Sequence, residues 1–208
     1  MVLRVLRRIL AALKSLVTRK QAPGILPQSN SSSQTPSNPP EAPLRPNDEE
    51  KLKALYPPFA DLVRQLLVEA AQQGMQVGIF EGMRTMERQR ELYAQGRDAS
   101  GKVIDHSKVV TDAAPGLSAH NYGLAVDLVF NGAPANKPWQ WSWGPQFPWG
   151  KLANLGISLG LDAAYFWKKF PEQPHYEKIY GLTYHELLAT YVNEGMEGVW
   201  KRLDQIKS

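Results

Sequence analysis

The chain has 208 residues, of which 43% are hydrophobic and 21% charged, as in an ordinary globular protein. It contains no cysteine, which excludes disulfides, thiolate metal ligands and a cysteine nucleophile. The formal net charge of +4 is unevenly spread, because residues 1–47 carry seven Lys/Arg and one acid whereas residues 48–208 carry seventeen Lys/Arg and nineteen acids. The body of the protein is therefore slightly acidic, and we do not expect it to bind nucleic acid.

Residues 1–20 predict a cationic amphipathic helix, because Leu3, Leu6 and Leu10 recur at helical spacing with arginines between them. The segment is too short and too charged to span a membrane. Its apolar stretch is interrupted at Lys14 and no clear cleavage site follows, so it is a poor signal peptide. Three interpretations stay open: a frayed tail, contact with a membrane surface, and an unconventional export signal.

Residues 21–47 are rich in Pro and Ser and nearly free of large apolar side chains, which predicts a disordered linker. We expect one folded, monomeric domain over residues 48–208. Asn47, followed by three acids, predicts a capped helix start, and Thr85 predicts another.

Helical periodicity alternates with short β-branched runs along this domain. The sequence predicts helices over residues 59–74 and 151–160, and a further one after a capping box formed by Thr183 and Glu186. Strands are predicted at residues 75–80, 124–130 and 173–180, and a long loop at residues 97–117. This pattern indicates an α+β domain with a small antiparallel sheet and flanking helices.

The segment SAHNYGLAVD places His120 seven residues before Asp127, an odd spacing that would put the two side chains on opposite faces of one continuous strand. They can meet if the chain turns before the strand begins, and Gly123 can adopt the backbone angles of such a turn. His175 stands at the start of another short strand. Two histidines and an aspartate suit a catalytic zinc site, whereas an isolated histidine near a strand is more often a hydrogen-bonded core residue than a metal ligand.

Glu172 precedes His175 by three residues in the segment EQPH. Beside a zinc ion, such a carboxylate can take a proton from water and pass it to a leaving amine. The alternative interpretation is a solvated loop acid.

Aromatic residues and two further histidines are less informative. Trp139, Trp141, Trp143 and Trp149 lie in one Pro- and Gly-rich span, which indicates either a wall that lines a groove and stacks on glycans or a satellite core. His106 and His185 are expected at solvated positions.

Three blocks of the sequence resemble the zinc L-alanyl-D-glutamate endopeptidases and their relatives, the D-alanyl-D-alanine carboxypeptidases and dipeptidases that act on peptidoglycan stem peptides. The blocks are GMRTMERQRELYAQGR, GLSAHNYGLAVDLVF and FWKKFPEQPHYE, in this order. The shared pattern is S-x-H-x-x-G-x-A-x-D, followed at a distance by an acid, two residues and a histidine. The resemblance covers roughly residues 75–180.

The resemblance implies three ligands for Zn²⁺, which are His120, Asp127 and His175. It implies that Glu172 is the general base and that Arg84 stabilises the oxyanion or anchors the substrate, as a fixed cation does at a developing negative charge. Ser118 would contact substrate beside the metal. Gln89 and Tyr93 would lie on the helix that supports Arg84, where plain packing is their alternative role.

The resemblance leaves the scissile bond open. The endopeptidases usually carry Asp at the position of Glu172, whereas the dipeptidase and carboxypeptidase relatives carry Glu. We expect a zinc peptidase that cuts the L-Ala–D-Glu bond, with a D-alanyl-D-alanine carboxypeptidase, a non-catalytic wall-binding module and a membrane-disrupting N-terminal helix as alternatives. Its place of action would be the cell wall or periplasm, either as a phage endolysin released through a holin or as a bacterial enzyme anchored by residues 1–20.

Overall fold

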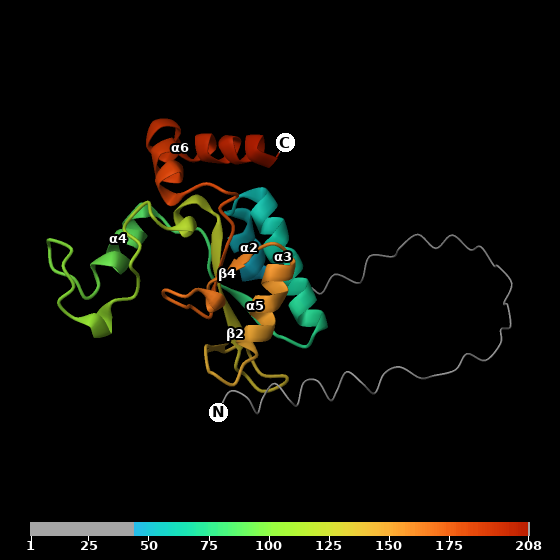
Figure 1. Cartoon of the computed structure of the whole chain (residues 1–208). Helices are drawn as coiled ribbons and strands as arrows, with labels where there is room; N and C mark the ends of the chain where they lie inside the picture. Colours follow the sequence, from blue (N-terminus) through green and yellow to red (C-terminus); the bar gives the residue numbers. More distant parts are fainter. Residues whose placement is uncertain (1–43, 208) are drawn as a thin grey trace, which may run out of the picture. The chain divides into compact units, whose positions relative to one another are not determined.

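The structure is a computed structural model that describes residues 44–207 (Figure 1). The amphipathic helix predicted over residues 1–20 and most of the predicted linker lie outside the described residues. The described chain forms an α+β domain with a small antiparallel sheet and flanking helices, which confirms the predicted fold class. Within this part, no helix combines the length and apolarity that crossing a membrane requires.

Five α-helices lie in the described part of the chain. They are α2 (Pro46–Lys53), α3 (Pro57–Gln72), α4 (Met86–Ala94), α5 (Trp149–Ser158) and α6 (Tyr184–Lys207), and short 3-10 turns are η1 (His106–Lys108), η2 (Ala119–Tyr122) and η3 (Ala164–Phe166). The strands are β1 (Val77–Glu81), β2 (Ala125–Asn131), β3 (Trp141–Ser142), β4 (Asp162–Ala163) and β5 (His175–Glu177). Their order is β1-β2-β5-β4, and β3 pairs with the far end of β2.

The two faces of β2 differ. Val126, Leu128 and Phe130 are buried in the core, which the apolar faces of α3 and α5 cover. Because side chains alternate along a strand, Asp127 points to the opposite face. We call this opposite face of the sheet the site face.

A register shift interrupts the pairing of β1 with β2. Ile79 lies opposite Leu128 and Glu81 lies opposite Asp127, so Phe80 between them has no partner on β2. Such a β-bulge places two residues of one strand against one residue of the other and redirects side chains, often beside a functional site. Here the bulge turns Glu81 toward the site face, where Asp127 lies.

Two predicted boundaries are wrong. Helix α2 begins at Pro46 after Arg45, not at a cap formed by Asn47, because a Pro at the first helical position needs no hydrogen-bond partner for its nitrogen. Strand β5 ends at Glu177, short of the predicted residue 180, because Tyr180 and Gly181 have left-handed backbone angles (φ 53° and 80°) that end the extended conformation.

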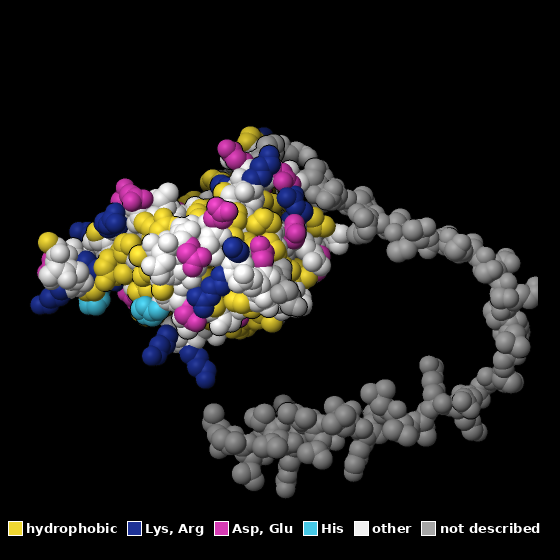
Figure 2. Space-filling view, turned by 90° about the horizontal axis from the view of Figure 1, so that it is seen from above, with side chains coloured by type: hydrophobic (Ala, Val, Ile, Leu, Met, Phe, Trp, Pro, Cys, Tyr) yellow, Lys and Arg dark blue, Asp and Glu magenta, His cyan; other side chains and the backbone are white. Residues whose placement is uncertain are grey.

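Helix α4 and the loop after it project from one side of the domain in Figure 1. The loop predicted over residues 97–117 contains the short turn η1 and a single β-bridge between Arg97 and Val103. In Figure 2, basic and acidic side chains are interspersed over the face that is drawn. This mixture agrees with the low net charge of residues 48–208.

Candidate metal centre and active-site cleft

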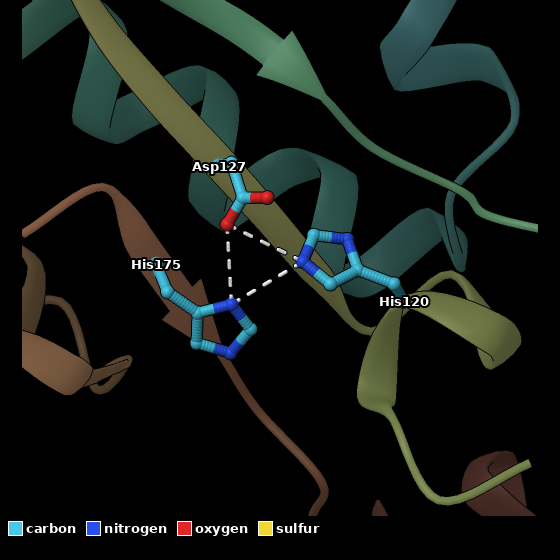
Figure 3. A group of neighbouring side chains, drawn as sticks. All are labelled: His120, Asp127 and His175. Carbon is cyan, nitrogen blue, oxygen red and sulfur yellow. Dashed lines mark hydrogen bonds and ion pairs between the residues drawn. The ribbon is translucent and has the colours of Figure 1, made fainter. Parts of the chain in front are cut away.

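Three side chains from separate segments meet at the site face of the sheet (Figure 3). His120 comes from η2, Asp127 from β2 and His175 from the first position of β5. Their ligand atoms all lie within 4.8 Å of one another, and such a group can hold a metal ion. We call these three residues the metal group. The structure therefore brings together the residues that the sequence predicted as zinc ligands.

The turn before β2 makes this meeting possible. Gly123 follows η2 with a left-handed backbone (φ 70°), and a Cβ atom there would lie 3.0 Å from the Tyr56 nitrogen and 3.2 Å from the Leu55 Cα. Only glycine suits both the angle and the close approach. The turn returns His120 to the face from which Asp127 projects.

Each imidazole is oriented by a hydrogen bond on its other nitrogen. His120 Nδ1 donates to the Gly82 carbonyl oxygen at 2.7 Å, and His175 Nε2 lies 2.9 Å from a carboxylate oxygen of the buried Glu177. Tyr184 donates to the second oxygen of Glu177 at 2.6 Å. These bonds leave His120 Nε2 and His175 Nδ1 as the atoms that face Asp127, an arrangement typical of metal-binding histidines.

The spacing of the three ligand atoms suits a small tetrahedral cation. His120 Nε2 and His175 Nδ1 are 3.2 Å apart, and the nearer Asp127 oxygen is 3.4 Å from the first and 3.2 Å from the second. Zinc bonds of about 2.0–2.1 Å in tetrahedral geometry require ligand atoms roughly 3.3–3.4 Å apart. The residues present thus fit a zinc ion, with a fourth position left for water or substrate.

The mutual electrostatics of the group favour bound positive charge. Burial opposes the ionisation of Asp127, yet the two histidines hold the pKa of its carboxyl far below the usual range. Burial likewise disfavours the imidazolium of His175, but hydrogen bonds and charge from Asp127 and Glu177 raise its pKa to about 10. Two carboxylates around one buried imidazole thus create a site where a cation is stabilised.

Arg84 is fixed beside this group. It is buried, and its guanidinium donates to Gln89 at 2.8 Å, to Glu81, and to the outer oxygen of Asp127 at 3.4 Å. Among the described residues, no acceptor lies within hydrogen-bonding distance of its Nε. This N–H is itself buried, so what the guanidinium offers the cleft is a fixed positive charge that its other hydrogen bonds hold in place.

A cleft of about 500 Å³ contains the whole group. Ser118, Arg84 and Glu172 line it together with the three candidate ligands. The backbone N–H of Glu172 is anchored to the Ala164 carbonyl at 3.1 Å, and although the side chain is exposed to the cleft, the surrounding protein desolvates its carboxyl and raises its pKa. Every site residue predicted from the sequence therefore lies in one cleft.

Some other residues position the site, and others lie outside it. Gln89 is fully buried and links Arg84 to the Ala113 carbonyl, so it supports the site from α4. His106 and His185 are exposed, and neither belongs to the cleft lining. The sequence analysis missed Glu177 and Glu81. The spacing of Glu177 two residues after His175 on one strand was the available signal, because such residues share a face.

An α+β domain with a His–Asp–His group and a carboxylate in one cleft is an arrangement that occurs in metal-dependent hydrolases. Residues 53–168 match the VanY family, described as D-alanyl-D-alanine carboxypeptidase. The chain is also 33% identical, over 129 residues, to the peptidoglycan L-alanyl-D-glutamate endopeptidase CwlK of Bacillus subtilis strain 168, with 60% of this chain and 74% of CwlK covered. The chain therefore belongs to the VanY family of peptidases.

Solved structures of similar fold include two peptidases. The L-Ala D-Glu endopeptidase ChiX of Serratia marcescens is 23% identical, with a TM-score of 0.47, and the match covers 71% of this chain and 94% of ChiX. A variant of the vancomycin resistance D,D-pentapeptidase VanY, in complex with Zn(II), is 21% identical, with a TM-score of 0.44, and the match covers 68% of this chain and 80% of that one.

Proposed function

We propose that the protein is a zinc-dependent peptidoglycan peptidase that hydrolyses the L-Ala–D-Glu bond of stem peptides. One observation carries this proposal. The three candidate ligand atoms have the spacing of a tetrahedral zinc site, and Glu172 and Arg84 line the same cleft. A binding module would need neither a proton carrier nor a fixed cation beside its metal.

His120, Asp127 and His175 would hold the ion. When bound, zinc supplies Lewis-acid polarisation of the scissile carbonyl and lowers the pKa of the attacking water. Glu172 takes the proton from that water and delivers it to the leaving amine. Arg84 places a fixed positive charge beside the oxygen on which negative charge develops, and its bonds to Gln89 and Glu81 hold it in that position.

Two scissile bonds are compatible with this machinery. The L-Ala–D-Glu bond is supported by the similarity to CwlK, whose name states that activity. The D-Ala–D-Ala bond is supported by the description of the VanY family and by a glutamate, not an aspartate, at position 172. We favour the first because the match to CwlK extends over 74% of that enzyme.

Mass spectrometry of purified peptidoglycan digested by the zinc-loaded protein distinguishes these bonds. We expect fragments with a new D-Glu amino terminus, and no fragments in a chelated control. Release of free D-Ala alone would assign the protein as a carboxypeptidase. No metal-dependent cleavage would reject the peptidase function.

Several further expectations follow from the same proposal. The enzyme would act as a monomer in the cell wall or periplasm. Residues 1–20 would contact a membrane surface, and residues 21–47 would link them to the catalytic domain. Vesicle sedimentation of the full chain, compared with a chain that lacks residues 1–20, tests the membrane contact.

A further inference from the structure

Three aromatic side chains form an exposed surface that the proposed mechanism does not use. Phe80, Trp141 and Trp143 are 46%, 37% and 42% exposed, and we call them the aromatic platform. The Phe80 ring meets Trp141 edge-on at 5.9 Å and Trp143 edge-on at 5.0 Å between ring centroids. Large rings that pack on one another yet stay open to solvent often mark a binding surface.

Residues at the start of helix α2 hold this platform in place. The buried Asp48 accepts two hydrogen bonds from Arg45, at 2.8 and 2.5 Å, and one from the Ile79 backbone N–H at 2.9 Å. The Arg45 guanidinium, held in this way, stacks on Trp141 at 4.7 Å and also on Trp139. A positioned cation on an indole fixes the ring, and more than a third of Trp141 stays exposed to solvent.

Lys51 fixes the bulge itself. Its ammonium donates to the carbonyl oxygens of Ile79 and Phe80, at 2.6 and 2.8 Å, and lies 5.4 Å from the Trp141 ring. The platform is thus a built structure, since one helix holds both its backbone and one of its rings.

The platform is continuous with the catalytic cleft. Trp141 lies opposite Asn131 on β2. Asn131 and Asp127 are four residues apart on this strand, so both point to the site face. Phe80 precedes Glu81, the residue paired with Asp127, and Phe80 also lines the cleft. A ligand that extends out of the cleft past Phe80 therefore contacts the platform.

We propose that the aromatic platform is a saccharide subsite, which binds a hexosamine ring of the glycan strand that carries the stem peptide. The inference rests on the proposed function, because the substrate is then a peptide attached to a sugar. The faces of a pyranose ring present C–H groups with partial positive charge, and these stack on the negative faces of aromatic rings.

The position of the platform also bears on the scissile bond. In peptidoglycan, L-Ala is joined to the lactyl group of the sugar, so only one residue separates the sugar from the L-Ala–D-Glu bond. At about 3.5 Å per extended residue, the sugar then lies on the order of 10 Å from the reacting carbonyl. The D-Ala–D-Ala bond lies roughly 10 Å further along the peptide. A saccharide subsite that borders the cleft at Phe80 suits the first bond.

Binding of sugar without peptide tests the platform independently of hydrolysis. Isothermal titration of the full zinc-loaded chain with short, peptide-free glycan fragments should give saturable binding. Trp143→Ala should weaken it about tenfold, as loss of one well-placed aromatic contact does, and Trp143→Tyr should retain most of it. Phe166→Ala is the control, because Phe166 is an aromatic side chain of similar exposure, 48%, that does not belong to the platform. No binding, or equal binding by Trp143→Ala, would overturn the inference.

Kinetics on paired substrates then connect the platform with catalysis. Trp143→Ala should lower kcat/KM about tenfold on a disaccharide-linked stem peptide and leave it unchanged on the same peptide without sugar. Equal loss on both substrates would overturn the saccharide subsite. If the wild-type protein binds the glycan fragments but cleaves neither substrate, the proposed peptidase function fails while the saccharide subsite stands.

Discussion

The two histidines of the metal group are oriented by different kinds of hydrogen-bond partner. His120 is oriented by a backbone carbonyl, which no substitution can remove, whereas His175 is oriented by the Glu177 side chain. Glu177 is itself held by Tyr184. The orientation of His175 therefore depends on two side chains, Glu177 and Tyr184, that are not candidate metal ligands.

Replacement of Glu177 should weaken metal binding. Glu177→Gln keeps the shape of the side chain but removes the charge that stabilises the Nε2–H of His175, so we expect about tenfold lower zinc affinity. Competition with a chromophoric chelator measures this affinity. Tyr184→Phe should cause a smaller loss in the same direction. Unchanged affinity in Glu177→Gln would show that Glu177 only packs against His175.

Replacement of Glu172 should lower the rate of hydrolysis without weakening metal binding. Glu172→Gln removes the proton carrier but no metal ligand, so the protein should retain its zinc while kcat falls about 10²–10⁴-fold. Metal content and steady-state rates measure the two effects. Glu197→Gln, at an exposed position on α6, is the control and should be fully active. Loss of zinc from Glu172→Gln would instead make this residue part of the metal site.

At the scale of secondary structure, the start of α6 is fixed by the predicted capping box. Thr183 Oγ1 accepts from the Glu186 backbone N–H at 3.2 Å, and the Glu186 carboxylate accepts from the Thr183 backbone N–H at 2.8 Å. The helix then bends at Gly195, whose backbone is not helical (φ 69°). Beyond this kink, Trp200 donates to the Tyr122 carbonyl, and so α6 packs against the turn that carries His120.

Loss of the cap should destabilise the domain. Thr183→Ala should lower the free energy of unfolding by about 1 kcal/mol, because one backbone N–H loses its acceptor. Urea denaturation should show a lower midpoint with an unchanged slope. Thr183→Ser keeps the hydroxyl and should remain close to the wild type, whereas an equal loss in both variants would assign the effect to the lost methyl group.

The same cap predicts a pH dependence of stability. Hydrogen bonds from Thr183, with a contribution from Arg202, hold the pKa of Glu186 below its ordinary value of 4.5. The folded state thus prefers the ionised form, and this stabilisation is fully present above about pH 4.5 and is lost as the pH falls through the lowered pKa. The stability difference between wild type and Glu186→Gln should shrink in acid. A difference that does not change with pH would contradict this account.

At the scale of the whole molecule, the metal group ties together segments that are distant in sequence. Asp127 and His175 are 48 residues apart, and they meet through the pairing of β2 with β5. A ligand that binds only the folded state stabilises it by mass action. A zinc ion here would therefore stabilise the whole sheet, including the short strands β4 and β5.

Metal removal should show whether a bound ion stabilises the fold. We expect the chelated protein to lose hydrolytic activity and to unfold at a lower temperature. Readdition of zinc at 100 times its Kd should restore roughly 2.7 kcal/mol of stability. Differential scanning fluorimetry over a zinc series measures the shift, and a His120→Ala variant should not respond. An unfolding temperature independent of zinc would argue against a metal at this group.

The sequence allowed prediction of the fold class, and the candidate ligands that it indicated lie together in the structure. His120, Asp127 and His175 stand in short segments with clear turn and strand signals. The bulge at Phe80 was not predictable, because MQVGIF shows no alternation from which a one-residue shift could be detected. Strand β3 has only two residues and no periodicity, so the partnership of Trp141 with Phe80 depends on tertiary pairing alone.

The late position of His175 in the chain has a consequence for biosynthesis. Translation delivers His120 and Asp127 long before the third ligand, and β2 cannot pair with β5 until that later segment exists. A nascent or prematurely terminated chain that stops before residue 175 thus lacks His175, the third candidate ligand. Any activity that needs all three candidate ligands would therefore arise only after residue 175 has been made and β5 has paired with β2.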